Sequence, residues 1–301
     1  LSRDGPGLLL RDILRGADPQ IDAVVQTIAQ VSPDILVIQG FDYDLGGAAL
    51  SAFADLLADG GAAYPTQFAL PPNAGLQTAL DMDGDGKTGG PRDAQGYGRF
   101  FGDGAMAILS RYPIVPDQVQ DYSTLLWRNL HGATLPQTDA GPFPSVAAQQ
   151  EQRLSSHGHW VVPVNTPTHG AVTLMTSHAT PPVFDGPEDR NGLRNQDEIL
   201  FWDHYMGGAF TVPPSEKLIL LGDMNNDPNK GEGLKSAIHR LLDHPALQDP
   251  LEGQPTALFD GLGEMRVDYL LPSDDWRVIA SGIAQNPDAS RHSLIWVDLD
   301  R

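Results

Sequence analysis

Residues 218–228 read LILLGDMNNDP and are the most informative stretch of the chain. Its short apolar run is typical of a buried strand, which stops at Gly222 and cannot continue past Pro228. Asp223 and Asn225 follow the run directly, so the pattern places a carboxylate and a carboxamide at the end of a rigid strand. Enzymes of the α/β class carry their chemistry at such strand ends, but an Asx-rich turn after a strand has the same composition.

Other apolar runs of the chain also meet an ionisable residue. Asp268, His178 and His292 each lie in or directly beside such a run. An aspartate in a strand needs a partner because an unpaired buried carboxylate is costly. An aspartate that orients a histidine is a common general base near neutral pH. A single strand-end histidine would more often be structural, but four strand ends of this kind in one chain favour a catalytic site.

Helical and extended patterns alternate along the chain, which indicates an α/β protein. Helices are predicted over residues 19–31, where Asp18 can cap the first turn, over 48–57 and over 188–206. Further strands are predicted over residues 35–38, 160–164 and 171–176. Two stretches, at about 71–103 and 115–150, lack periodicity and are typical of inserted loops. We therefore expect one domain over residues 1–301 with these two insertions.

The charge balance constrains the partners of the protein. The 301 residues include 39 acidic and 19 basic ones, which gives a formal net charge of −20. Such a surface repels nucleic-acid phosphates, whose binding depends on Lys and Arg, so a small phosphorylated substrate is favoured over DNA or RNA. The sequence contains no Cys and no apolar run of about 18 residues that would predict a membrane span. A start at Leu1 instead of Met fits a secreted or periplasmic protein without its leader, and fits a cloned fragment equally well.

The order of the strand-end motifs resembles that of the endonuclease/exonuclease/phosphatase superfamily, whose fold is that of deoxyribonuclease I. The motifs are, in chain order, His178, the sequence GDMN at 222–225, VDY at 267–269 and SRH at 290–292. Residues 33–39 and 104–114 resemble two earlier strands of the family. The resemblance spans roughly residues 19 to 299 and extends to secreted bacterial members of unassigned substrate.

This resemblance implies a four-layer α/β sandwich, in which two mixed β-sheets pack face to face with helices outside. It implies a hydrolase of phosphate mono- or diesters, here of a small or lipid-like substrate. Asp223 would orient or deprotonate a water with Asn225 beside it. His292, held by Asp268, would act on the phosphoryl oxygens together with His178. Mg²⁺ or Mn²⁺ would normally stabilise the leaving oxygen.

The chain departs from the family at two positions that concern the metal. Gly40 follows Gln39 where the family has a metal-binding Glu, and Arg291 replaces the Asp of the usual Ser-Asp-His. Arg291 is therefore a candidate for direct phosphate binding. Asp42 and Asp44 are the nearest replacement metal ligands, or else belong to a polar loop. The alternative function is a catalytically silent binding protein that keeps the pocket and has lost its metal carboxylates.

The sequence DMDGDGK at residues 81–87 has the spacing of the first half of a calcium loop. Asp81, Asp83 and Asp85 alternate before a Gly that allows a tight turn. The usual Glu at the twelfth position is absent, since Arg92 stands there. We expect a structural Ca²⁺ that orders the first insertion, with an acidic loop without a cation as the alternative.

Three further residues are candidates for contacting the substrate. His157 and His159 alternate before a predicted strand, so one of them at most faces the site. A surface position is favoured for His157, and His159 remains the candidate. Arg190 and Asn191 follow His178 in a loop that could contact the substrate, although the same residues could simply begin a helix.

Overall fold

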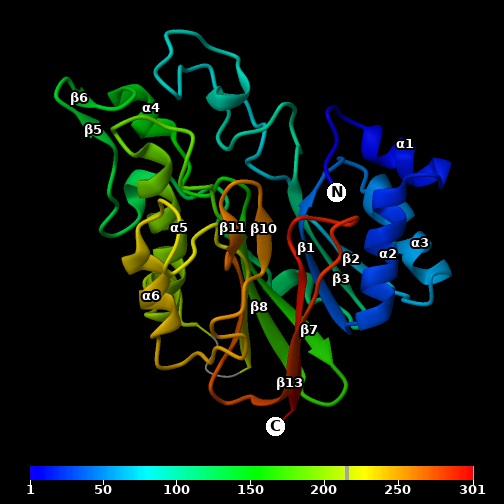
Figure 1. Cartoon of the computed structure of the whole chain (residues 1–301). Helices are drawn as coiled ribbons and strands as arrows, with labels where there is room; N and C mark the ends of the chain where they lie inside the picture. The colour runs from blue at the N-terminus through cyan, green and yellow to red at the C-terminus, as the bar shows by residue number, and fades with distance from the viewer. Residues whose placement is uncertain (214–216, 301) are drawn as a thin grey trace.

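The computed structural model describes residues 1–213 and 217–300 (Figure 1). Its helices are α1 (Leu8–Arg15), α2 (Pro19–Val31), α3 (Ala48–Asp59), α4 (Val146–Glu151), α5 (Arg190–Met206) and α6 (Lys235–Leu242). Its first strands are β1 (Ile35–Phe41), β2 (Thr66–Phe68), β3 (Ala105–Ser110), β4 (Gln120–Asp121), β5 (Gln137–Thr138), β6 (Gly141–Pro142) and β7 (His159–Thr166). The later strands are β8 (Gly170–His178), β9 (Leu218–Asp223), β10 (Ala257–Phe259), β11 (Gly263–Met265), β12 (Asp268–Pro272), β13 (Arg277–Ala284) and β14 (Leu294–Asp300).

Two sheets lie at the centre of the molecule. The larger has the strand order β12-β9-β8-β7-β4, in which β8 and β9 run parallel and the other neighbours antiparallel. The smaller has the order β1-β3-β2 and is antiparallel. The expected α/β sandwich is confirmed, with one mixed and one antiparallel sheet in place of two mixed sheets. β13 and β14 form a separate hairpin, and β14 lies beside β12.

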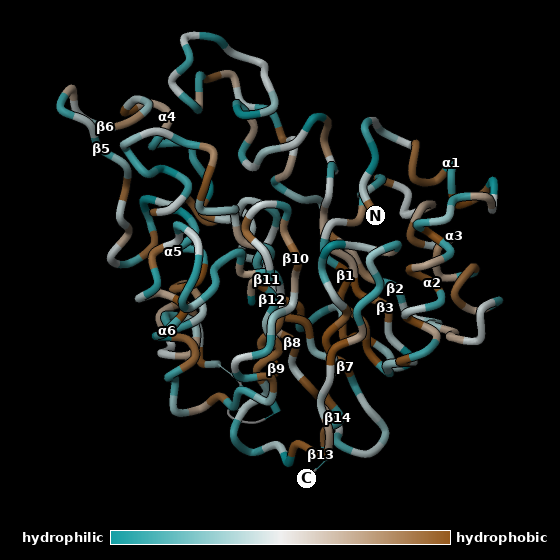
Figure 2. The backbone as a smooth tube through the Cα atoms, viewed as in Figure 1, coloured by the Kyte–Doolittle hydropathy of each residue, from teal (hydrophilic) through white to brown (hydrophobic). Residues whose placement is uncertain are grey.

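Apolar side chains that alternate along the strands fill the space between the layers. On β7, Trp160 and Val162 pack against Met106 and Ile108 of the smaller sheet, whereas Val161 belongs to the core on the opposite face. That second core is closed by α5 and α6, and α1, α2 and α3 cover the outer face of the smaller sheet. The order of layers is thus helix, sheet, sheet, helix (Figure 1). Figure 2 shows the hydrophobic colour gathered along these central strands, as period-two burial on both faces requires.

Most predicted elements are confirmed with small changes in their bounds. The side chain of Asp18 accepts hydrogen bonds from the backbone N–H groups of Gln20 and Ile21 and so caps α2 as expected. The predicted helix at 188–206 begins at Arg190. The short helix α1 is an element that the sequence pattern did not indicate, because Gly7 precedes it without a capping side chain.

The two insertions differ in regular structure. Within residues 71–103 the structure has one 3₁₀ turn, Pro91–Asp93. That insertion is tied to the body of the protein by Asn73, whose amide donates to the carbonyl oxygens of Ser123 and Ser155. Residues 115–150 contain the short strands β4, β5 and β6 and most of α4. None of the helices in the described chain has the length and apolar character that a membrane crossing requires.

Candidate active site

Strand β9 delivers Asp223 to the edge of the larger sheet. Gly222 has a φ of 154°, and a Cβ at this position would lie 2.0 Å from the carbonyl oxygen of Ser177 on β8. Glycine is therefore required for the close approach of these strands. The side chain of Asp223 is buried, and its Oδ1 accepts the backbone N–H of Asn225 at 2.8 Å. Asn225 has a φ of 48°, which asparagine tolerates, and its Nδ2 donates to the carbonyl oxygen of Ala179.

Antiparallel pairing places Asp268 of β12 directly opposite Asp223. His292 comes from the segment before β14, and its Nδ1 lies 3.0 Å and 3.2 Å from the two carboxylate oxygens of Asp268. The same nitrogen is 3.9 Å from Oδ2 of Asp223. The Nε2 atom of His292 has no hydrogen-bond partner among residues 1–213 and 217–300. It is therefore free to contact a ligand.

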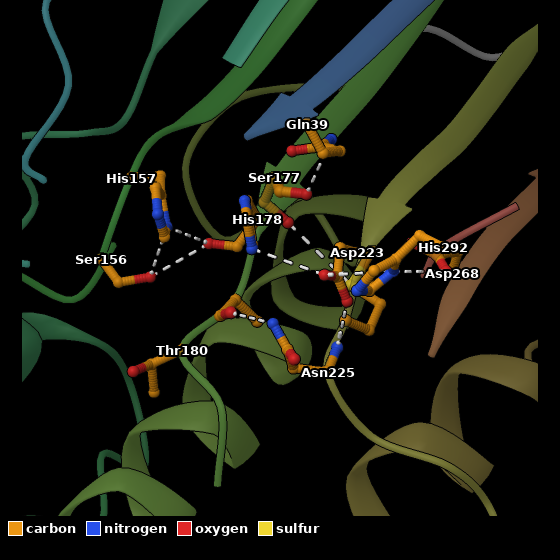
Figure 3. A network of polar contacts seen from close by, with 12 residues as sticks. Gln39, Ser156, His157, Ser177, His178, Thr180, Asp223, Asn225, Asp268 and His292 are labelled. Atoms are coloured by element: carbon orange, nitrogen blue, oxygen red, sulfur yellow. Dashed lines mark hydrogen bonds and ion pairs between the residues drawn. The ribbon is translucent and has the colours of Figure 1, made fainter. Parts of the chain in front are cut away.

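Parallel pairing brings His178 at the end of β8 opposite Asp223 from the other side. Its Nε2 lies 3.5 Å from Oδ2 of Asp223. The ring of His157 stacks on that of His178, with centroids 4.0 Å apart and planes inclined by 6°. His157 Nδ1 and Ser156 Oγ both contact the backbone carbonyl of His178, at 3.1 Å and 3.0 Å (Figure 3). The five strand-end residues of the sequence prediction thus lie together.

Burial and neighbouring charges set the protonation of this cluster. Burial, and then the charge of Asp268, raise the pKa of Asp223 to about 7. Burial lowers the pKa of His292, but the hydrogen bond and the charge of Asp268 outweigh burial and raise this pKa to about 9. Burial, together with the charges of His157 and His292, holds the pKa of His178 well below its usual value. Near neutral pH, His292 is therefore charged and His178 is neutral. Between them lies the carboxyl group of Asp223, whose pKa is close to the pH, so that it can both lose and accept a proton.

The cluster also has oxygen donors that suit a hard divalent cation. Candidate ligand atoms of Asp223, Asp268 and His292 lie within 4.8 Å of one another. Gln39 on β1 points its Nε2 toward Thr176 and Ser177, while its buried Oε1 has no partner. The two carboxylates, and the unpartnered buried oxygen of Gln39 in the same network of polar contacts (Figure 3), fit Mg²⁺ or Mn²⁺, which prefer oxygen ligands.

Asp42 and Asp44, the expected replacement ligands, have structural partners. The carboxylate of Asp42 accepts the backbone N–H groups of Arg3 and Gly104. Asp44 accepts those of Ala48 and Ala49 and so caps the start of α3. Within the described residues neither carboxylate belongs to a His and carboxylate cluster tight enough to share an ion. The geometry therefore favours the polar-loop interpretation of both.

Arg291 lies beside the cluster and is exposed. Its guanidinium carbon is 5.7 Å from the ring centroid of Phe259, and that ring meets His292 edge to face at 5.5 Å. Arg291 forms no ion pair within the described part of the chain. Its charge is thus held next to His292 by an aromatic contact.

Three expected substrate contacts are placed elsewhere. His159 is fully buried, its Nε2 contacts the carbonyl oxygen of Glu198, and its ring packs on Phe201 and Trp202, so the expectation for His159 is wrong. Of the two alternating histidines, it is His157 that faces the site. Arg190 donates to the carbonyl oxygen of Met82, and Asn191 to that of Val183. Both therefore organise loops instead of joining the cluster.

The acidic loop of the first insertion brings Asp81, Asp83 and Asp85 within 4.8 Å of one another. The two carboxylate oxygens of Asp81 accept backbone N–H groups of Gly84 and Gly86. Arg190 at the start of α5 bonds this loop through Met82, which is fully buried. The loop is thus anchored near the helix that follows His178.

Two residues of the cluster were not among the predicted site residues. His157 and His159 alternate in the sequence, and this alternation does not indicate which of the two side chains points toward the site. Gln39 lies in an apolar run before the atypical Gly40, and a single carboxamide there carries no local signal of a site. Only the stacking and the orphaned oxygen identify them.

Comparison with known proteins agrees with the arrangement of the strands. The sequence profile of the Endonuclease/Exonuclease/phosphatase family matches residues 12–292. No curated protein sequence matches the chain.

Among solved structures, an endonuclease/exonuclease/phosphatase from Beutenbergia cavernae DSM 12333 superposes with a TM-score of 0.60 at 17% identity, over 99% of this chain and 68% of that one. An endonuclease/exonuclease/phosphatase family protein from Leptotrichia buccalis C-1013-b gives 0.53 at 16% identity, over 94% and 93%. The human Nocturnin catalytic domain, solved with a bound sulfate anion, gives 0.51 at 13% identity, over 94% and 87%. At these identities the likeness concerns the fold.

Proposed function

Because this chain belongs to the endonuclease/exonuclease/phosphatase family, we propose that it hydrolyses a phosphate mono- or diester at the cluster around Asp223. The observation that carries the proposal is the facing pair of Asp223 and His292, whose Oδ2 and Nδ1 atoms are 3.9 Å apart. One group has a pKa raised to about 7 and the other a pKa raised to about 9. A base and an acid are thus available together at neutral pH.

Each residue has a distinct role in this reaction. Asp223 accepts a proton from the water whose oxygen attacks phosphorus, and the N–H of Asn225 holds the carboxylate in place. His292 keeps Nδ1–H on Asp268 and donates from Nε2 to a phosphoryl oxygen. His178, neutral and next to Asp223, is a second donor from Nε2. The bond from the water oxygen to phosphorus forms as the ester P–O bond breaks, and the leaving oxygen takes up a proton from solvent water. Positioned donors of this kind supply much of the rate gain in phosphoryl transfer.

A divalent cation, Mg²⁺ or Mn²⁺, would be held by Asp223, Asp268 and the free Oε1 of Gln39. When bound, such a cation neutralises charge on the phosphoryl group and the leaving oxygen. Arg291 adds positive charge beside His292, and a guanidinium binds phosphate in a fork. With the net charge of −20, a small or lipid-like ester is favoured over nucleic acid.

A silent binding protein is the second candidate, because Gly40 and Arg291 stand where the family motifs carry metal carboxylates. Such a protein would bind a phosphate group through His292 and Arg291 without turning it over. Both candidate functions predict that the protein binds a phosphate group, but only the phosphoesterase hydrolyses the ester.

The deciding experiment is an assay of the purified protein with p-nitrophenyl phosphate, bis(p-nitrophenyl) phosphate and a long DNA duplex. We expect hydrolysis of at least one small ester with Mg²⁺ or Mn²⁺, loss of activity with excess chelator, and much slower cleavage of DNA. Phosphate binding in calorimetry without any turnover would support the silent binding protein. Rapid cleavage of DNA would contradict the substrate class.

The acidic loop gives a separate prediction, namely that Asp81, Asp83 and Asp85 bind a structural Ca²⁺. Chelator-treated protein should take up Ca²⁺ in calorimetric titration, and Asp83→Ala should weaken this binding by about tenfold or more because one oxygen ligand is lost. Asp139→Ala, in the exposed turn between β5 and β6, is the matched control and should bind like the wild type. No uptake at millimolar Ca²⁺ would mean that the loop has no cation role.

A further inference from the structure

Helix α5 carries four buried polar side chains, and most of them bond the loops that carry the candidate site. Arg194, Asn195, Asp197 and Glu198 are each at most 3% exposed. Buried groups of this kind are costly unless they are fully hydrogen-bonded. Their partners therefore reveal what the helix holds in place.

Glu198 bonds the two loops that carry the stacked histidines. Its Oε1 accepts the backbone N–H of Ser156 at 2.6 Å, and its Oε2 accepts that of Thr180 at 2.6 Å. Ser156 precedes His157, and Thr180 lies two residues after His178. The carboxylate of Glu198 thus fixes the backbone next to His157 and the backbone shortly after His178, the two residues whose rings stack. Burial raises the pKa of Glu198, and the charge of Arg194 opposes this.

Asn195, one helical turn before Glu198, bonds the next loop. Its Nδ2 donates to the carbonyl oxygens of Thr180 and Met224 at 2.8 Å each. Its Oδ1 accepts from Nδ2 of Asn226. Met224 lies between Asp223 and Asn225, so Asn195 connects the loop after His178 to the loop of the candidate base.

We propose that Asn195 and Glu198 form a clamp that positions His157, His178 and Asp223 for the reaction. The inference rests on the proposed function for its effect on rate, and on geometry alone for its effect on the histidines. Neither residue belongs to the Asp223 cluster itself, so both are positioning residues. The clamp acts mainly through the backbone. Its hydrogen bonds end on backbone N–H or C=O groups of Ser156, Thr180 and Met224, and one further bond ends on the side chain of Asn226.

His157 connects the backbone held by the clamp to the ring of His178. Its Nδ1 and the hydroxyl of Ser156 both contact the carbonyl group of His178, and its ring covers one face of the His178 ring at 4.0 Å. A shift of the Ser156 backbone would move this ring. His178 would then lose the surface that orients its Nε2 toward Asp223.

Asp197 offers a matched control on the same helix. It is as buried as Glu198, and its carboxylate accepts the Trp127 indole N–H and the Thr134 backbone N–H at short distance, besides a longer bond from the neighbouring Gln196. Trp127 and Thr134 belong to the second insertion and not to the histidine loops. Asp197→Asn therefore removes a comparable buried charge without touching the clamp.

The test compares Glu198→Gln, Asn195→Ala and Asp197→Asn with the wild type by NMR of histidine-labelled protein. Stacked rings shift each other's proton signals, so the clamp predicts that Glu198→Gln and Asn195→Ala lose the ring-current shifts of His157 and His178. Asp197→Asn should keep them. With an active wild type, Glu198→Gln should lower kcat by about 10–100-fold and change KM much less, while Asp197→Asn leaves both near their wild-type values.

Several outcomes would overturn the clamp. Unchanged histidine shifts in folded Glu198→Gln would do so, as would equal changes in Asp197→Asn, which would indicate general loosening of α5. If the variants do not fold, hydrogen exchange of the wild type decides: the Ser156 and Thr180 amides should exchange as slowly as those of β8, and fast exchange refutes the clamp. A wild type without any turnover would defeat the proposed function and leave these NMR and exchange results valid.

Discussion

Asp223→Asn is expected to lower kcat by about 10²–10⁴-fold, the usual contribution of a general base. The change removes the proton acceptor and keeps the side-chain oxygen that accepts the Asn225 N–H. The fold should therefore persist, and the melting temperature should stay close to that of the wild type. The measurement is kcat on the best small ester, with circular dichroism to confirm folding.

The dependence of kcat on pH tests the general-base role of Asp223 independently. Asp223 must be ionised to accept a proton, and its pKa is raised to about 7. Activity should therefore rise with pH as this group loses its proton. A bound cation favours the charged carboxylate, so at saturating metal the acid limb should lie at or below about 7. Asp223→Asn should abolish that limb in any residual activity.

Asp227→Asn is the matched control for this substitution. Asp227 is also buried and lies on the same loop, but its carboxylate accepts the backbone N–H groups of Asn229, Lys230 and Arg266. This variant should lose stability and keep its kcat within a few-fold of the wild type. A folded Asp223→Asn enzyme with near wild-type turnover would remove Asp223 from the mechanism.

His292→Gln is expected to lower kcat by about 10²–10³-fold, the cost of losing one preorganised donor to a developing charge. At saturating metal, Asp268→Asn should have a smaller effect on kcat and a specific effect on the pKa of His292. Burial lowers the pKa of His292, and the hydrogen bond and charge of Asp268, followed by the charge of Asp223, raise this pKa to about 9. Without the carboxylate, His292 should lose its proton at a lower pH, and the alkaline limb of activity should shift downward with it.

NMR titration of metal-free protein measures this directly. The His292 ring should titrate near pH 9 in the wild type and well below that in Asp268→Asn. The double variant His292→Gln, Asp268→Asn should lose little more activity than His292→Gln alone, because the two residues act as one unit. His169→Gln, in the turn at the opposite end of β8, should leave activity unchanged. A His292 that titrates near its usual 6.5 in the wild type would refute the pairing.

The sequence was sufficient to predict the strands that carry the candidate site, their polar ends and the family. Short continuous apolar runs indicated strands buried on both faces, and Asp223, Asp268 and His292 stand in or directly beside such runs. Their convergence was expected from the family resemblance, and the structure brings it about in two ways. Strand register places Asp268 and His178 opposite Asp223, whereas His292 comes from the segment before β14. The catalytic roles of these residues remain predictions.

Other features of the site depend on contacts between distant parts of the chain, which a local sequence pattern does not specify. The alternation of His157 and His159 does not reveal which one faces the core, and packing against Phe201 and Trp202 assigns that place to His159. Asp42 and Asp44 matched a metal role by composition, yet the backbone amides of Gly104 and Ala48 happen to lie against them. The clamp of Asn195 and Glu198 joins segments that are up to 42 residues apart in sequence. Such long-range bonds leave no local signal, because a buried polar residue on a helix reveals its partner only when the chain has folded around it.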